Sequence, residues 1–425
     1  GIKVEKNKKV INTPYQTDIL IIGGGMAGIE TAYHLKDSKQ KVTVIDSDII
    51  GFGVSSNSTG KLTYLQELPY HKLTQTFDFY TALKYLESQK EAIQIARKNM
   101  IQGNLDCNFE IVSSYTFTND EKKIKAFQKE QAFFDKIKLP YQVVESLPIP
   151  YSIQYGIRVD DTAVFHPVKY IRGLLKIIQK NGIDVYENVR ALTLEKHDKH
   201  YIVHTNRGDI IATKVVVTTH YPFFLDPGWI PLRTHIEKDY VGAAFIDSVH
   251  NFSAITEGSP TESIRYHQDQ NAYIIYAGES HKTDKAMDTK KEYEKLKKQM
   301  EDYLQVTPLY QWSTHDVMTN DGLPFIGRME KNNDHLLIAT GFNKWGMTNG
   351  IIAGKILSDI LLGKENEYEK IFDPNRSLNK KKVTSFFLDV YQTSKSILKT
   401  KLHTNKPYYP NNVKITHEDG KKIGI

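Results

Sequence analysis

Apolar and polar positions alternate in blocks at the start of the chain. Four consecutive apolar residues follow Asp18, which suits a strand buried on both faces of a parallel sheet. A glycine-rich segment comes next, and residues 29–35 then carry apolar side chains at helical spacing. Residues 42–45 form a second apolar run, which ends in Asp46. The pattern predicts a strand–helix–strand unit at the start of the fold.

Two further buried strands are expected, and the second is followed by a helix near the other end of the sequence. Residues 214–217 and 336–339 read as buried strands, and a helix is expected over residues 351–362, with Gly363 as its stop. The stretch between has a different pattern. It predicts antiparallel strands at residues 236–246, 263–267 and 272–277, and an exposed, charged helix at residues 289–303.

The glycines between the first strand and helix fit the pattern G-x-G-x-x-G. Gly23 would permit a tight turn, Gly25 would let the backbone approach a pyrophosphate, and Gly28 would let the helix pack close to the strand. The helix N-terminus would offer free N–H groups and a positive dipole end to the phosphates. Asp46 stands where an acid can accept hydrogen bonds from an adenosine ribose. This context predicts a dinucleotide site, but the motif does not distinguish NAD from FAD.

Two further segments bear on the identity of the cofactor. Residues 51–62 are rich in small and hydroxyl residues and could lay N–H groups and hydroxyls along an extended cofactor, although a plain flexible loop has the same composition. Residues 340–350 hold a second glycine-rich turn between a strand and a helix. A nicotinamide enzyme would normally continue with alternating strands and helices. The two segments therefore favour FAD.

Three separated motifs resemble the glycine oxidase and D-amino-acid oxidase family of flavoproteins. They are the first glycine motif with Asp46, the D-G-x-P-x-I-G segment at residues 321–327 and the A-T-G-F turn at residues 339–342. The resemblance covers roughly residues 17–372 and implies FAD and an α/β fold, in which a Rossmann-like FAD-binding domain is interleaved with an antiparallel-sheet α+β substrate domain. The implied FAD-binding domain comprises residues 17–95, 150–222 and 313–372, the substrate domain residues 96–149 and 223–312, and the C-terminal tail residues 373–425.

The motifs and the resemblance together predict which residues contact FAD. In such proteins the last helix points its N-terminus at the pyrimidine edge of the flavin and stabilises the negative charge that develops there on reduction. A middle strand pair serves the adenine side. The predicted FAD-contacting residues are Gly23, Gly25, Met26, Ala27, Gly28, Asp46, Ser47, Gly53, Ser55, Ser58, Thr59, Gly60, Lys61, Leu62, Val189, Thr218, Thr219, Gly341, Gly346, Met347 and Thr348.

Residues 59–63 and 341–350 carry a closer likeness to family members with a C-terminal Rieske iron–sulfur domain. A Rieske cluster needs two Cys and two His, and the chain has a single cysteine, Cys107. Residues 413–415 and 421–425 resemble the opening hairpin of such a domain. The resemblance therefore implies a Rieske domain that is lacking or truncated here, and Cys107 is expected to be a small buried apolar residue rather than a nucleophile.

The stretch before the D-G-x-P segment bears on the substrate. Glycine-oxidase-like enzymes hold the substrate carboxylate there with an arginine, whereas this chain has Asp316. A carboxylate would repel an amino-acid carboxylate and favour a cationic group, which resembles the pattern in gamma-glutamylputrescine-oxidase-like members. Asp316 could equally be a structural partner of Arg328 or of a helix end. Lys61, His315 and Lys344 are further catalytic candidates, the lysines for oxygen activation or charge balance.

Composition and charge narrow the class of protein. The chain has 425 residues and a formal net charge of +6, a small excess that does not indicate a nucleic-acid partner. The single cysteine favours a reducing compartment. Residues 1–17 hold no apolar run of signal-peptide length, and no run reaches the roughly 20 apolar residues that span a bilayer. These features predict a cytoplasmic protein, in which a basic amphipathic helix at residues 382–402 packs on the protein itself rather than on a membrane.

The sequence thus predicts an FAD-dependent oxidoreductase that oxidises a C–N bond of an amine or amino acid by hydride transfer to flavin N5, without a metal. Oxygen or a redox partner would accept the electrons. Three alternatives stay open: a dehydrogenase that passes electrons to an iron–sulfur or quinone acceptor, a flavin electron carrier that oxidises no amine, and an NAD-dependent enzyme. The second glycine turn argues against the last of these.

Overall fold

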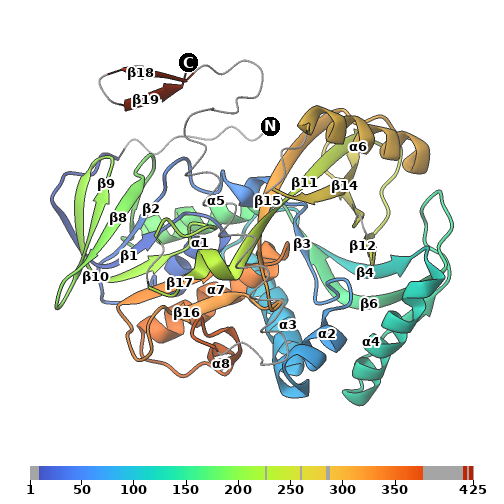
Figure 1. Ribbon diagram of the computed structural model, residues 1–425, viewed down its shortest axis with the longest axis horizontal. Coiled ribbons are helices and arrows are strands. Elements are labelled where there is room, and N and C mark those ends of the chain that lie inside the picture. Colours follow the sequence, from blue (N-terminus) through green and yellow to red (C-terminus); the bar gives the residue numbers. More distant parts are fainter. Residues whose placement is uncertain are drawn as a thin grey trace. The chain divides into compact units, whose positions relative to one another are not determined.

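The computed structural model describes residues 9–224, 227–258, 261–283 and 288–376, and the backbone of two short strands, β18 (Ile415–Glu418) and β19 (Lys421–Gly424). Two sheets and the helices packed on them form one compact unit (Figure 1). The mixed α/β fold that the sequence predicts is confirmed.

Parallel strands form the centre of the first sheet, whose order is β16-β17-β10-β1-β2-β7. Strand β1 pairs in parallel with β10 and with β2, and β10 pairs in parallel with β17. Strand β16 closes one edge in the antiparallel direction. The strands are β1 (Tyr15–Ile22), β2 (Val42–Ile45), β7 (Asp184–Tyr186), β8 (Ala191–Lys196), β9 (Tyr201–Thr205), β10 (Gly208–Val217), β16 (Phe325–Arg328) and β17 (Leu336–Thr340).

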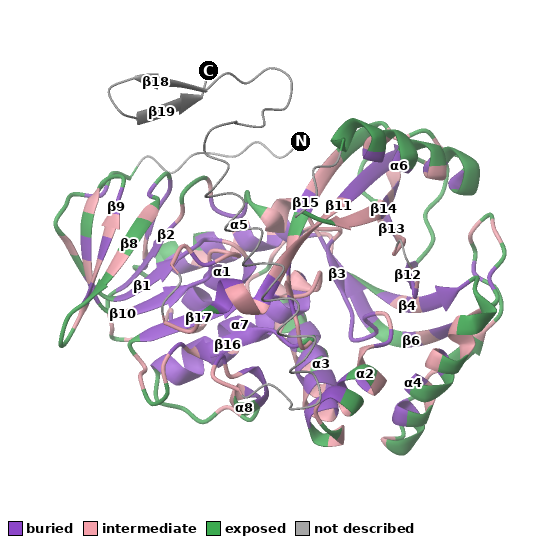
Figure 2. Cartoon of the chain, in the orientation of Figure 1, coloured by how far each residue is buried: buried purple, intermediate pink, exposed green. Residues whose placement is uncertain are grey.

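Helices α1 (Met26–His34), α5 (Pro167–Lys180) and α7 (Gly346–Leu361) lie together beside this sheet (Figure 1). All or nearly all residues of α1 and α7 are buried, so both helices are apolar around most of their circumference (Figure 2). Helix α3 (Phe79–Gln102) packs on α7. The largest apolar cluster joins β1, α1 and α7, and thereby holds the two glycine-rich turns next to each other.

The second sheet has the order β15-β11-β14-β13-β12-β4-β6-β3. Its strands are β3 (Lys61–Leu62), β4 (Glu110–Thr118), β5 (Gln142–Val144), β6 (Tyr155–Val164), β11 (Thr234–Phe245), β12 (Phe252–Thr256), β13 (Ser263–Gln268), β14 (Ala272–Lys282) and β15 (Tyr310–Thr319). Further helices in the described part of the chain are α2 (Pro69–Thr76), α4 (Ile124–Lys136) and α8 (Glu369–Phe372), and there are three 3-10 turns among the described residues.

Helix α6 (Thr289–Leu304) packs on β11 and β14. Leu296, Met300 and Leu304 recur at four-residue spacing and are buried against the sheet, while Asp288 caps the helix by accepting a hydrogen bond from the Lys290 N–H. The sequence predicts this helix and the strands β11, β13 and β14 correctly.

One predicted boundary is wrong in an informative way. The last helix begins at Gly346, five residues before the expected start at residue 351. Two of its first five residues are glycines, so this segment reads locally as a loop, and contacts from elsewhere in the fold stabilise the helix there.

The division into two domains remains a prediction. Strands β6 and β15 hydrogen-bond within the second sheet, whereas the expected boundaries assign residues 155–164 and 313–319 to the FAD-binding domain. The chain crosses between the two sheets repeatedly, and the predicted boundary between residues 312 and 313 falls inside β15.

The C-terminal strands β18 and β19 pair as an antiparallel hairpin, described here by itself. The amphipathic helix expected at residues 382–402 lies outside the described residues. Among the described residues, none of the helices is both long and apolar enough to cross a membrane. Cys107 is buried, as expected, and burial raises the pKa of its thiol to about 11.

Candidate active site

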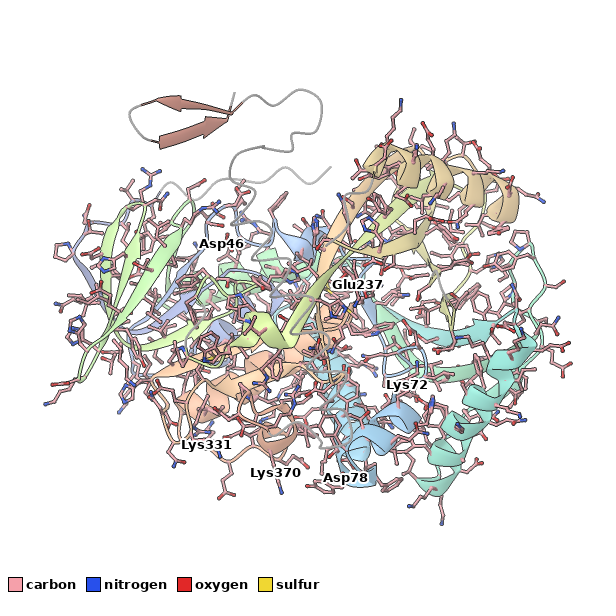
Figure 3. All side chains as sticks on the ribbon, in the orientation of Figure 1. Asp46, Lys72, Asp78, Glu237, Lys331 and Lys370 are labelled. Atoms are coloured by element: carbon pink, nitrogen blue, oxygen red, sulfur yellow. The ribbon has the colours of Figure 1, made fainter. Side chains whose placement is uncertain are left out.

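A cavity of about 560 Å³ runs from the first sheet to the second. Gly23, Asp46 and Thr218 line it, and each directly follows the carboxyl end of one of the parallel strands β1, β2 and β10. Doubly wound sheets bind their ligands at this edge. In Figure 3, Asp46 marks the side of the first sheet, and Glu237 lies on β11 of the second sheet.

The first glycine turn has no room for side chains. Gly23 has a φ of +110°, and a Cβ at this position would lie 2.5 Å from the Thr218 carbonyl oxygen. A Cβ on Gly28 would lie 1.9 Å from the Gly23 carbonyl oxygen. Helix α1 therefore approaches β1 as closely as two backbones allow, as the sequence predicts, and its N-terminus opens into the cavity at Gly25 and Met26.

Asp46 is held by the backbone on two sides. Its Oδ2 accepts a hydrogen bond from the Gly24 N–H at 2.7 Å, and its Oδ1 accepts one from the Asp48 N–H at 2.8 Å. Burial raises the pKa of Asp46, although these hydrogen bonds act in the opposite direction. The carboxylate keeps free lone pairs toward the cavity, so its predicted role as ribose acceptor fits this geometry.

The structure places most of the predicted FAD-contacting residues on the cavity wall. The residues that line it are Gly23, Gly25, Met26, Ala27, Asp46, Ser47, Gly53, Ser55, Ser58, Thr59, Lys61, Val189, Thr218, Thr219, Gly346 and Met347. Five others, Gly28, Gly60, Leu62, Gly341 and Thr348, are not among the lining residues. Leu62 and Thr348 are fully buried behind the wall, and the three glycines make close backbone approaches instead.

The second glycine turn is conformationally strained. Gly341, Asn343 and Lys344 all have positive φ angles, of 71°, 50° and 70°. Non-glycine residues adopt this region at a cost, and the surrounding contacts must offset it. Asn343 Oδ1 accepts a hydrogen bond from the Thr319 N–H at 2.7 Å, which ties the turn to β15. The turn thereby presents the N-terminus of α7 to the cavity.

A hydrogen-bond network of buried side-chain amides holds the N-terminus of α7 in place. Gln66 Nε2 donates to Gln89 Oε1 at 2.9 Å and to Thr348 Oγ1 at 3.0 Å. Gln89 Nε2 donates to Asn349 Oδ1 at 2.9 Å, and the Tyr85 hydroxyl donates to Gln66 Oε1 at 2.6 Å. All five side chains are buried, so the bonds have little competition from water. The network explains why a glycine-rich segment forms the first turn of α7.

Replacing Gln89 by leucine is expected to loosen this turn. The change leaves Gln66 and Asn349 with unsatisfied buried groups, and the free energy of unfolding should fall by about 2 to 3 kcal/mol. Because α7 would lose its support beside the cavity, the Kd for FAD should rise by roughly tenfold, which corresponds to about 1.4 kcal/mol. Fluorescence titration of the apoprotein with FAD measures the second effect.

Asn99→Leu provides the control on the same helix. Asn99 is also buried and donates to Glu30 and Tyr170, far along α3 from the α7 N-terminus. It should lower stability without changing the Kd for FAD. If both variants bind FAD equally well, the amide network does not position the α7 turn.

The second sheet contributes an acidic group of side chains to the cavity. Asp239 on β11 and Asp316 on β15 both line it. Burial, reinforced by the neighbouring Asp239 carboxylate, raises the pKa of Asp316 to about 7. Arg328, the structural partner considered for Asp316, instead forms ion pairs with Asp334 and Glu369.

Lys344 lies against this acidic group. Its Nζ is 3.0 Å from both Glu237 Oε2 and Asp239 Oδ1, and it donates to Ser280 Oγ at 2.6 Å. These carboxylates raise the pKa of Lys344 despite its burial. The lysine is therefore a permanent cation that joins the α7 turn to strands β11 and β14, which fits charge balance better than proton transfer.

Lys61 has a different environment. Its Nζ donates to Ser263 Oγ and to the Ala254 carbonyl at 3.4 Å, and it lies 5.6 Å from the centre of the Trp345 ring. Burial lowers the pKa of the Lys61 ammonium to about 7. A lysine on the cavity wall that is partly neutral at physiological pH can accept a proton.

His315 is not brought to the cavity. It is exposed and is absent from the lining residues, whereas Thr314 and Asp316 on either side belong to the lining. Successive residues of a strand point to opposite faces, so His315 points away from the face that Asp316 shares with the cavity.

Several lining residues were not singled out from the sequence. They are Asp239, Thr314, Ser263, Trp345 and His220. The alternation along β11 and β15 could have indicated Asp239 and Thr314, because every second residue of each strand faces the cavity. Burial lowers the pKa of His220 to about 4, so this imidazole is neutral. No sequence pattern marks it.

The residues present fit an extended dinucleotide. A helix N-terminus, a glycine turn without room for side chains and a buried carboxylate meet at one end of the cavity, which are the groups that hold an adenosine diphosphate. The α7 N-terminus and Lys344 lie further along the wall, where a flavin ring would need partners for developing negative charge. No cluster of His, Cys, Asp or Glu within the described ranges could hold a metal ion.

Comparisons with known proteins agree with this site. A putative Rieske 2Fe-2S iron–sulfur protein, YhfW of Bacillus subtilis, is 31% identical over 397 residues, which cover 91% of this chain and 77% of the relative. Gamma-glutamylputrescine oxidoreductase of Escherichia coli is 21% identical and covers 84% of this chain and 87% of its own. The structure of glycine oxidase from Geobacillus kaustophilus superposes with a TM-score of 0.73 at 16% identity, over 86% of this chain and 100% of that protein.

The family match extends over most of the described chain. Residues 18–360 match the DAO family, FAD dependent oxidoreductases. This range includes both glycine turns, the acidic group on β11 and β15 and nearly all of α7. FAD is therefore the cofactor that the family implies, and amine or amino-acid oxidation is the type of reaction. The chain belongs to the DAO family of FAD-dependent oxidoreductases.

Proposed function

We propose that the protein oxidises the C–N bond of an amine whose ammonium group is held by Asp316 and Asp239. The observation that carries this proposal is the pair of carboxylates on the wall of the same cavity that Gly23 and Asp46 line. A cationic group gains strongly from a carboxylate in a site shielded from water, and a substrate carboxylate would be repelled there.

The charges around the cavity support a cationic substrate. Lys344 is the cation nearest the acidic group, and it is already bound by Glu237, Asp239 and Ser280. Lys344 carries one positive charge, whereas Glu237, Asp239 and Asp316 carry three negative charges when Asp316 is ionised. The acidic group then has a net negative charge. An ammonium would complete this arrangement.

The proton of the substrate ammonium has an acceptor in Lys61. The neutral Lys61 amine has a lone pair in addition to the hydrogen bonds that it donates to Ser263 and Ala254. FAD, which the first glycine turn, Asp46 and the N-terminus of α7 would hold, would supply the two-electron oxidation by accepting a hydride from the carbon next to nitrogen. The neutral amine would thereby become a protonated imine, which water would hydrolyse to a carbonyl compound and ammonium.

The electron acceptor after the oxidation has two candidates. One is oxygen. The other is an iron–sulfur or quinone acceptor, which is supported by the likeness to a protein named as a putative Rieske iron–sulfur protein. Slow peroxide formation together with fast reduction of an electron-accepting dye would indicate the second candidate.

Asp316→Asn should raise the KM for amines by about 100-fold, because loss of a buried counter-charge costs about 2 to 5 kcal/mol of binding. Asp316 loses its charge below its pKa of about 7, whereas an alkylammonium stays charged. The KM of the unchanged protein should therefore rise as the pH falls through about 7, and the KM of the variant should not. The measurement is anaerobic bleaching of the flavin absorbance by a panel of amines and amino acids.

Asp302→Asn is the matched control, since Asp302 is exposed on α6 and outside the cavity. It should leave the KM unchanged at every pH. The proposal fails if amino acids bleach the flavin and amines do not, or if Asp316→Asn has the kinetics of the unchanged protein.

A further inference from the structure

Two hydrogen-bonding oxygens on the cavity wall have no partner in the described residues. Thr314 is only 9% exposed, and its Oγ1 is buried without a hydrogen bond. The same holds for Asp239 Oδ2, while Asp239 Oδ1 is bound by Lys344. Buried polar atoms nearly always have a partner, so two unpaired oxygens on one wall point to a missing ligand.

Strand pairing places these oxygens together. Asp239 and Thr314 are direct partners across the antiparallel pair β11 and β15. Asp316 lies two residues beyond Thr314, on the same face of β15, and also lines the cavity. When both are ionised, Asp239 and Asp316 only accept hydrogen bonds and cannot satisfy each other; only the protonated form of Asp316, which has a pKa of about 7, could donate to Asp239. The group that completes this wall must be a donor.

The number of acceptors limits the chemistry of that donor. Asp239 Oδ2, Thr314 Oγ1 and the Asp316 carboxylate are three separate acceptors on one stretch of the cavity wall. A primary ammonium carries three N–H donors and one positive charge, whereas each N-methyl group removes one donor and sets a methyl against an oxygen. Val241 and Ala277, which line the cavity on the neighbouring strands, suit the alkyl part of such a molecule.

We infer that Asp239, Thr314 and Asp316 form a binding subsite for a primary ammonium group. The inference rests on the proposed function, since it names the substrate class of the same site. It goes further in assigning Thr314 a part in recognition and in excluding N-methylated amines as good substrates.

The test separates binding from oxidation. tert-Butylamine has no hydrogen on the carbon next to nitrogen, so it can bind as a primary ammonium but cannot be oxidised there. Its Kd for the FAD-loaded protein is measured by calorimetry and compared with those of N-methyl- and N,N-dimethyl-tert-butylamine, while the flavin absorbance is followed to verify that their N-methyl groups are not oxidised. Butylamine and N-methylbutylamine are tested in parallel for anaerobic bleaching of the flavin.

We expect the primary ammonium to bind at least about tenfold more tightly than its N-methyl derivative, as loss of one charge-assisted hydrogen bond implies. Thr314→Val keeps the shape of the side chain and removes the hydroxyl. It should weaken the primary ammonium by roughly tenfold and the dimethyl derivative little. Thr234→Val is the control, because Thr234 is buried on β11, donates to the Ile230 carbonyl and is not one of the lining residues. FAD content and melting temperature verify that both variants fold.

The outcomes distinguish the two proposals. Equal Kd values for primary and methylated amines, or an equal loss for all three in Thr314→Val, would overturn the subsite even if amines bleach the flavin. Preferential binding of tert-butylamine with no bleaching by butylamine or any other amine would support the subsite and overturn amine oxidation.

Discussion

Gly23→Ala is expected to abolish FAD binding. The new Cβ would lie 2.5 Å from the Thr218 carbonyl oxygen, on a backbone with a φ of +110°. A side-chain rotation can relieve neither the collision nor the left-handed strain, because the colliding atom belongs to the backbone of Thr218, directly after β10. The turn or the end of β10 must move, and both line the cavity. Overpacking and left-handed strain together should lower the free energy of unfolding by about 3 kcal/mol. Denaturant unfolding of the apoprotein and titration with FAD measure the two effects.

Gly182→Ala is a matched control for this change. Gly182 has a φ of +84°, but a Cβ there would meet nothing within 4 Å. The variant should lose about 1 kcal/mol from left-handed strain alone and bind FAD normally. If Gly23→Ala behaves in the same way, the close approach of the glycine turn to β10 does not determine cofactor binding.

Lys344→Met should destabilise the protein by about 3 kcal/mol at neutral pH. The change leaves Glu237, Asp239 and Asp316 close together without the cation that now lies between them. Removal of one partner from a largely buried ion pair is strongly destabilising, because the remaining charges stay desolvated. The strained Lys344 backbone would also lose the contacts that hold the α7 turn to the second sheet. Urea unfolding across a pH series measures the effect.

The pH dependence of this loss follows from Glu237. A hydrogen bond with His235 lowers the pKa of Glu237 to about 2, and Lys344 acts in the same direction. A lowered pKa contributes stability above the ordinary value of 4.5, and this contribution is lost as the pH falls from there toward about 2. The difference between Lys344→Met and the unchanged protein should therefore be largest near pH 7 and shrink below about pH 4.5.

Lys295→Met is the control for loss of a lysine charge. Lys295 pairs with Glu292 at 3.1 Å, but its side chain is 55% exposed, so the variant should lose less than about 1 kcal/mol. Equal losses for the two lysine variants would show that the Lys344 contacts contribute no more than a surface ion pair.

Local sequence patterns were sufficient to predict the elements around the first glycine turn. The strand β1, the glycine turn, helix α1 and strand β2 follow one another within about 30 residues, the length of a single such unit. Burial on both faces makes each strand apolar throughout, and the turn has a glycine wherever a Cβ would collide. The roles of Gly23 and Gly28 could therefore be predicted without knowledge of the remaining chain.

Patterns were insufficient where the required contacts come from distant segments. Helix α7 begins at Gly346 because Gln66 and Gln89, more than 250 residues earlier, bond to Thr348 and Asn349. Two glycines among its first five residues predict a loop, and no neighbouring residue reveals the amides that overcome this preference. The same limit applies to the predicted domain boundaries, which assign β6 and most of β15 to the FAD-binding domain, since strand partners separated in sequence decide which sheet a strand joins.

The sequence by itself determined that this chain is a DAO-type FAD oxidoreductase with a glycine turn at residues 23–28, and that an acid stands at position 316, where the family resemblance leads one to expect an arginine. Only the tertiary structure decided what Asp316 has beside it. The register of β11 against β15 brings Asp239 to its side, next to Thr314 of the same strand as Asp316, and the fold sets Lys344 of a distant turn against the carboxylates. Strand register depends on side-chain packing over a whole sheet, and a one-residue shift would exchange the two faces, so the pattern within each strand could not specify which residues of the two strands meet.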